Sequence, residues 1–183
     1  MHGNFSELVH AWHDFYLLIG TAAAALIGLM FVAVSVGANY LTESHTAAVQ
    51  SFFTPTVVYF ASVFVTCVLL LAPLGPTPLG AILLALGLGG LGYASVVWVR
   101  MGRRGFTATI DMPDRLWYAL SPVAAHALVV VAATVLLVHN QESGLEILGT
   151  AIVLQLLVAI RNAWDITAWI VMRSQQNKSS PRA

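Results

Sequence analysis

The stretch Leu145–Val171, LEILGTAIVLQLLVAIRNAWDITAWIV, decides the fold that the sequence predicts. As a helix it would measure about 40 Å, whereas the hydrocarbon core of a bilayer is about 30 Å thick. The stretch therefore predicts a membrane-spanning helix that is longer than the bilayer requires. It also carries an opposite-charge pair, Arg161 and Asp165, in otherwise apolar surroundings.

The composition of the whole chain also indicates that the lipid bilayer surrounds the protein. Hydrophobic residues make up 58% of the 183 residues and charged residues only 9%, against about 25% charged in ordinary soluble domains. Too little polar surface remains to cover a water-soluble globule, so the lipid bilayer is the expected partner. The net charge of zero does not suggest binding to nucleic acid. Cys67 is the single cysteine, which excludes an internal disulfide.

The hydropathy pattern predicts an all-α, polytopic transmembrane helical bundle with five spans. Each span is an apolar run of about 20 residues, the length that a helix needs to cross a bilayer. We expect one transmembrane domain, residues 1–173, followed by a flexible cytoplasmic tail, residues 174–183. The predicted spans are 15–38, 55–72, 79–99, 117–138 and 145–171.

The basic residues predict the orientation of the bundle. They lie in two segments only, which share one side of the membrane in a five-span chain, and positive charge marks the cytoplasmic side. The N-terminus is then outside and the C-terminus is cytoplasmic. The residues outside the spans that carry this prediction are Arg100, Arg103, Arg104, Arg115, Arg173, Lys178 and Arg182.

Prolines and small residues predict how the helices pack. Pro73, Pro76 and Pro78 should end the second span and form a tight turn, which makes spans two and three an antiparallel hairpin. Small residues four apart let helix backbones approach closely in lipid. They indicate either packing within one subunit or a face for self-association, and they are Gly20, Ala24 and Gly28 in the first span and Gly87, Gly89, Gly90 and Gly92 in the third.

The charged pair is the first candidate site. Arg161 and Asp165 are four residues apart, so they share a helix face, and Asn162 lies beside them. Ionisable groups inside a span are costly and commonly functional. Alternatively, the excess length of this span places the pair at the cytoplasmic boundary, where it anchors the helix in the headgroup region.

Two further residues extend this prediction to an intramembrane polar network. His126 lies well inside the fourth span, at a height similar to that of Arg161 and Asp165, and it would titrate near neutral pH in such a cluster. Tyr59 in the second span can join the same network. The alternative for His126 is a neutral, hydrogen-bonded packing residue.

A second candidate site lies before the first span. His10, His13 and Asp14 have the spacing with which imidazole and carboxylate groups can hold a transition metal. Nearby acidic and basic groups on the same predicted side are Glu7, His139, Glu142 and Glu146. The pattern is not a specific zinc or di-iron signature, and no cofactor is expected. A pH-sensitive external surface is the competing interpretation.

The chain resembles a family of uncharacterised small bacterial inner-membrane proteins. The resemblance covers most of the sequence and is carried by four blocks: Trp12–Tyr16, Gly28–Ser35, Thr54–Val57 and Arg161–Asp165. It implies a bacterial inner-membrane location and no particular activity.

No motif of a soluble enzyme is present, so we do not expect catalysis. The Gly-rich segment 87–92 lies inside a span and is not a nucleotide-binding loop. Two functions remain open. The first is a small oligomeric, ion-conducting or proton-responsive channel-like protein, and the alternative is a non-catalytic accessory or scaffold subunit of a larger membrane complex.

Overall fold

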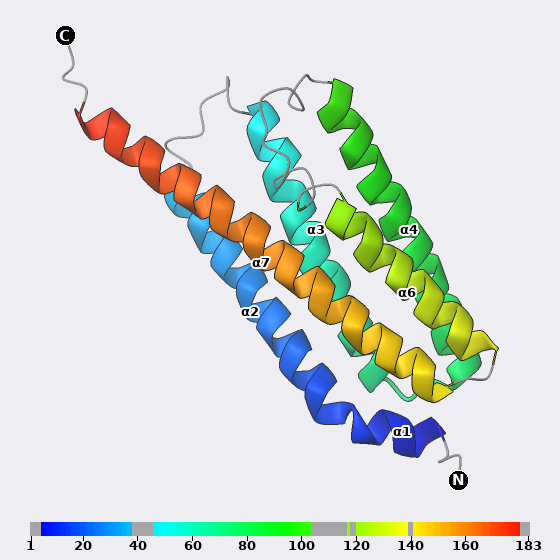
Figure 1. Ribbon diagram of the computed structural model, residues 1–183. Helices are drawn as coiled ribbons and strands as arrows, with labels where there is room; N and C mark the ends of the chain where they lie inside the picture. The colour runs from blue at the N-terminus through cyan, green and yellow to red at the C-terminus, as the bar shows by residue number, and fades with distance from the viewer. Residues whose placement is uncertain (1–4, 38–45, 104–116, 118–119, 139–140, 180–183) are drawn as a thin grey trace.

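A computed structural model of the protein describes residues 5–37, 46–103, 117, 120–138 and 141–179, and these form helices joined by short turns (Figure 1). The all-α prediction is therefore confirmed for this part of the chain. The helices are α1 (Phe5–Ala11), α2 (His13–Gly37), α3 (Thr46–Leu71), α4 (Pro76–Arg103), α6 (Ser121–Leu137) and α7 (Gln141–Ser179).

Four of these helices are long and apolar enough to cross a bilayer, which identifies a membrane protein. Their apolar segments are His13–Ser35, Thr54–Leu71, Pro76–Val99 and Gln141–Ala168. Helix α6 is equally apolar but has only 17 residues. In lipid a helix satisfies its own backbone hydrogen bonds, which is why apolar segments of this length fold as helices.

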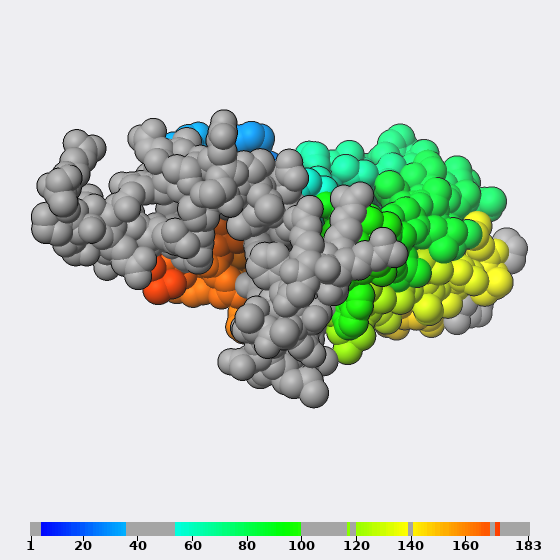
Figure 2. Space-filling view, turned by 90° about the horizontal axis from the view of Figure 1, so that it is seen from above, coloured from blue at the N-terminus to red at the C-terminus, as the bar shows by residue number. Residues whose placement is uncertain are grey.

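The helices form an elongated bundle in which neighbours run antiparallel, except that α2 and α7 run parallel (Figure 1). Helix α6 packs between α4 and α7, and α3 packs against both α2 and α7. The first turns of α4 and the last turns of α6 lie at one end of the molecule, as Figure 2 also shows. The short helix α1, which was not predicted, lies across that same end.

The predicted proline turn is confirmed. Helix α3 ends at Leu71 and α4 begins at Pro76, with the amide of Leu79 donating to the Gly75 carbonyl at 3.1 Å. The apolar segment of α3 is Thr54–Leu71, close to the predicted span 55–72, while the helix itself starts at Thr46 and continues through Pro55. Pro55 removes one backbone hydrogen bond, and the flanking turns hold the helix together across it.

The described helix α7 runs to Ser179, into the segment predicted to be a flexible tail. The flexibility of that segment stays a prediction. Three of the arginines that predict orientation, Arg104, Arg115 and Arg182, lie outside the described residues, as does His139 of the outer group.

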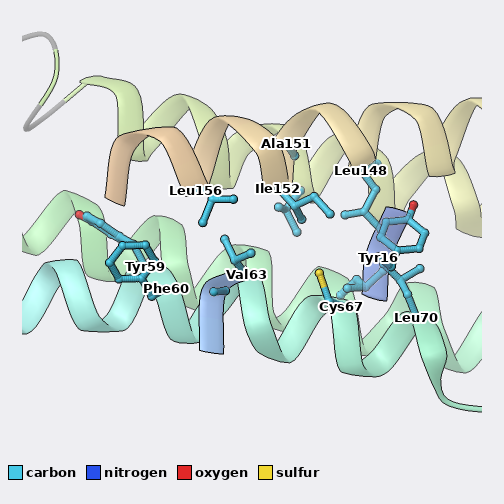
Figure 3. Close-up of a cluster of buried hydrophobic side chains, with 14 of the residues drawn as sticks. Tyr16, Tyr59, Phe60, Val63, Cys67, Leu70, Leu148, Ala151, Ile152 and Leu156 are labelled. Carbon is cyan, nitrogen blue, oxygen red and sulfur yellow. The ribbon is translucent and has the colours of Figure 1, made fainter. Parts of the chain in front are cut away.

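Buried apolar side chains from α2, α3 and α7 form the centre of the bundle. Figure 3 shows Leu148, Ile152 and Leu156 of α7 facing the α3 side chains, with Tyr16 and Cys67 beside Leu70. The Tyr16 hydroxyl donates to the Leu145 carbonyl at 3.3 Å, which ties α2 to the first turn of α7. Tyr16 is fully buried rather than part of an interfacial aromatic belt.

Glycine lets α4 and α6 approach closely. A Cβ atom at position 87 would lie 2.9 Å from a Val130 methyl group, and one at position 80 would lie 2.9 Å from Leu137 Cγ. At position 90 a Cβ atom would overlap the His126 ring. By contrast, Gly89 and Gly92 have open space around the corresponding position among the described residues. Gly80, Gly87 and Gly90 of α4 therefore pack against α6, whereas no described residue covers Gly89 or Gly92.

We expect Gly90→Ala to lower the free energy of unfolding by about 1–3 kcal/mol, because the added methyl group forces the His126 ring out of its position. Gly92→Ala is the matched control for protein kept monomeric by dilution in detergent: it adds the same atom to the same helix in space that is open within one chain, and the higher helix propensity of alanine should leave the stability of the monomer unchanged or slightly raised. Thermal or denaturant unfolding in detergent measures both. Equal stability of the two variants would contradict this packing.

Candidate functional site

Arg161 and Asp165 form an ion pair on the outside of the bundle. The Arg161 Nε atom donates to Asp165 Oδ2 at 3.3 Å, and the two side chains are 43% and 31% exposed. Trp164, between them, is 71% exposed. The pair therefore does not face the interior of the chain, and a half-exposed pair of this spacing stabilises a helix only slightly.

Trp117 marks the level of this pair along the bundle. The Arg161 guanidinium carbon lies 5.8 Å from the centre of the Trp117 ring, a distance suited to a cation–π contact. Trp117 precedes the first residue of α6 by four positions, so it lies on the side of α6 away from the α6–α7 turn. Along α7, Arg161 is about 30 Å beyond Gln141, which equals the thickness of a hydrocarbon core. This geometry favours the boundary anchor over the buried site.

Asn162 is the member of the predicted network that faces inward. Its side chain is 4% exposed, and its Oδ1 atom has no hydrogen-bond partner within the described residues. Gln155 lies two turns earlier on the same face of α7. Its side chain is 2% exposed, and its Nε2 and Oε1 atoms have no hydrogen-bond partner within the described residues. Each unpaired buried group of this kind costs about 1–3 kcal/mol.

His126 and Tyr59 are buried next to each other. Their ring centres are 5.9 Å apart, and both side chains are buried. The His126 Nδ1 atom lies 2.8 Å from the Pro122 carbonyl oxygen. A carbonyl oxygen only accepts, so Nδ1 carries a proton, and Nε2 of the neutral ring is an acceptor. The structure thus agrees with a neutral, hydrogen-bonded His126, which is buried whereas the Arg161–Asp165 pair lies on the outside.

Gln155 lies level with His126. Gly144 packs on Leu136, because a Cβ atom at position 144 would lie 2.7 Å from Leu136 Cγ. Helices α6 and α7 are antiparallel. His126 is ten residues before Leu136 on α6, and Leu154, the neighbour of Gln155, is ten residues after Gly144 on α7, so they lie at the same level. Tyr59 is at this level too, because its ring centre is 5.9 Å from that of His126. Three helices therefore place polar groups at the same height in the bundle.

Sequence reasoning missed Gln155. It is the one polar residue in the apolar run 151–160, and its spacing of seven residues from Asn162 puts both on one face of a helix. A helical projection of 145–171 would have separated this inward pair from Arg161 and Asp165. The two charges gave the stronger signal, and that signal suggested a buried site on the wrong face of the helix.

The predicted metal site gains no support from the structure. His13 Nδ1 is 3.0 Å from Asp14 Oδ1, and the His10 and His13 rings are 6.3 Å apart. Across the residues that the structure describes, no three His, Cys, Asp or Glu side chains are grouped as metal ligands. His10 and His13 instead line an open cavity of about 580 Å³ between α1 and the α3–α4 turn, whose other walls are mainly apolar.

Comparisons of the chain with protein-family models, with curated proteins and with solved structures found no match. The resemblance to small bacterial inner-membrane proteins stays a prediction.

We expect Asp165→Asn to lower the free energy of unfolding by less than about 1 kcal/mol, because water or headgroups can solvate Arg161 at the surface of the bundle. Removing the partner of a charge buried in hydrocarbon would cost several kcal/mol. Unfolding in lipid nanodiscs, compared with the Arg161→Gln/Asp165→Asn double variant, measures the coupling between the two side chains. A coupling above about 2 kcal/mol would place the pair inside the bilayer.

Proposed function

We propose that the chain crosses a bacterial inner membrane five times, with its N-terminus outside and its C-terminus in the cytoplasm. The direction of the helices supports five crossings. Helices α4 and α7 start at the same end of the bundle, and α6 runs back toward that end (Figure 1). The span 117–138 predicted from the sequence has 22 residues, and a helix of that length would measure about 33 Å, enough to cross the hydrocarbon core.

This topology predicts that the turn at residues 139–144 and the C-terminus lie on opposite sides of the membrane. We expect a cysteine at Ser143 to react with an impermeant thiol reagent from the periplasmic side, in a Cys67→Ala background. A cysteine at Ser179 should react only after the membrane is opened. Labelling of both positions from one side would contradict the crossing of the membrane by α7.

We further propose that the protein is a non-catalytic structural subunit that assembles with a second copy of itself through α2 and α4. The observation that carries this proposal is the contrast between two sets of glycines. Gly87 and Gly90 are covered by α6, whereas around Gly28, Gly89 and Gly92 no other part of the described chain comes within 4 Å of the position that a Cβ atom would take. Close helix contact in lipid depends on such small residues.

The exposed small residues continue along both helices. On α2 they are Thr21, Ala24, Ala25 and Gly28, and on α4 they are Ala81, Ala85, Gly89 and Gly92, all exposed. Only 17% of the residues in each of these two spans are buried, against 56% in α7. Helices α2 and α4 therefore offer most of their surface to lipid or to another helix, and four-residue spacing favours another helix.

We expect Gly28→Cys and Gly89→Cys variants, each in the Cys67→Ala background, to form disulfide-linked dimers when membranes are oxidised. Leu29→Cys and Leu88→Cys are the controls, because each is the exposed neighbour of a glycine and points to a different side of its helix. Electrophoresis without reductant measures the linked fraction. Equal crosslinking of the glycine and leucine positions would contradict assembly through the glycine faces of α2 and α4.

A second candidate function is an ion-conducting or proton-responsive channel-like protein. The observation that favours it is the polar level formed by Tyr59, His126 and Gln155 inside the bundle. The position of the Arg161–Asp165 pair argues against the network predicted from the sequence, since those charges lie on the outside. Absence of ion flux through reconstituted protein between about pH 5 and pH 8 would exclude this function.

A further inference from the structure

Three buried amide atoms on α7 have no hydrogen-bond partner within the part of the chain that the structure describes. They are Nε2 and Oε1 of Gln155 and Oδ1 of Asn162. Both residues are more than nine-tenths buried and share one face of the helix, about 10 Å apart along its axis. Buried amides in folded proteins are paired with protein groups or with ordered water. These atoms therefore require a partner from outside the described helices.

Buried polar side chains gather in one half of the lining around these residues. On α7 the buried residues from Leu145 to Ile152 are apolar, and Gln155 and Asn162 follow among the apolar Leu156, Val158 and Ala159. On α6 the polar His126 precedes an apolar series that ends at Leu136, and on α3 Thr56 and Tyr59 precede Phe60 and Val63. Thr66 is the exception in the apolar half, and a threonine hydroxyl can bond within its own helix.

The geometry points to a water-filled site between α3, α6 and α7, built on Gln155 and Asn162, with Asn162 nearer to Trp117 and Arg161 and Gln155 nearer to the apolar half. The buried polar side chains of the described residues are Thr56, Thr66, His126, Gln155 and Asn162, none of which carries a permanent charge. An ion would lack a counter-charge here, so the fitting occupant is a neutral molecule that both donates and accepts hydrogen bonds.

Water fits this site in its chemistry. The Gln155 amide offers two donor hydrogens and one acceptor oxygen, and Asn162 Oδ1 offers a second acceptor. Ala159 lies on the same face between them, and it is fully buried with the smallest side chain that carries a Cβ atom. A few water molecules along this face would satisfy all three atoms. Apolar Ile152 and Leu148 close the site toward the α6–α7 turn. The site does not depend on the assembly proposed above.

Cysteine reactivity tests the site, because thiols react through the thiolate, which forms only where water reaches. In full-length Cys67→Ala protein in detergent, we compare Asn162→Cys, Gln155→Cys and the control Ile152→Cys, using 2-aminoethyl methanethiosulfonate. Ile152 is buried on the same face, one turn from Gln155 in the apolar half. We expect position 162 to react fastest, and position 155 to react about tenfold faster than position 152 or more. Equal rates at 155 and 152 would overturn the proposal.

A second variant keeps the test decisive if the cysteine proteins fold poorly. Gln155→Met preserves the length of the side chain and removes the amide, and Leu156→Met controls for methionine at a neighbouring buried position. If water already satisfies the amide, the melting temperature of Gln155→Met should stay level with the control or fall below it. A melting temperature above both the control and the parent protein would show that the amide is unpaired in a dry core, and it would refute the site.

Discussion

The close approach of α4 and α6 is the contact on which the second half of the bundle depends. Gly80, Gly87 and Gly90 let α6 lie directly on α4, and the missing side chain at Gly90 makes room for the His126 ring. In lipid, apolar burial does not hold helices together, so close packing of this kind takes its place. Because α7 follows α6 after a short turn, the depth of α6 also sets the depth of Gln155, Asn162 and the charged pair.

The interior that results is divided along the axis of the bundle. Toward the α6–α7 turn it is packed with Leu, Ile, Val and Ala, and Tyr16 closes it by bonding to the Leu145 carbonyl. Toward the opposite end it contains an imidazole, a phenol and two carboxamides. Such groups are expensive in hydrocarbon unless each finds a partner. The apolar half thus supplies stability, and the polar half supplies the chemistry that a function can use.

The sequence predicts the helices well and their contacts poorly, for physical reasons. Apolar runs and the proline turn at Pro73–Pro78 identify spans because helix formation in lipid is a local property. Pro55 lies at the start of the apolar segment but not at the start of its helix, since a proline can lie within a helix that is supported on both sides. The depth of Arg161 and Asp165 could not be derived, because it depends on how far α7 extends past α6. Which glycines of α4 face α6 is likewise a tertiary property: Gly90 and Gly92 are only two residues apart, yet one is covered and the other open.

The position of the charged pair limits what the interior can do. Arg161 keeps its charge in nearly any environment, and its place beside Trp117 on the outside of the bundle means that it supplies no charge to the core. The buried groups that remain in the described core are neutral. A neutral polar core can hold water and align hydrogen bonds, but it offers no fixed counter-charge for a dehydrated ion. Any ion pathway would therefore have to use water or a surface shared between copies, and the exposed glycines of α2 and α4 are where such a shared surface would form.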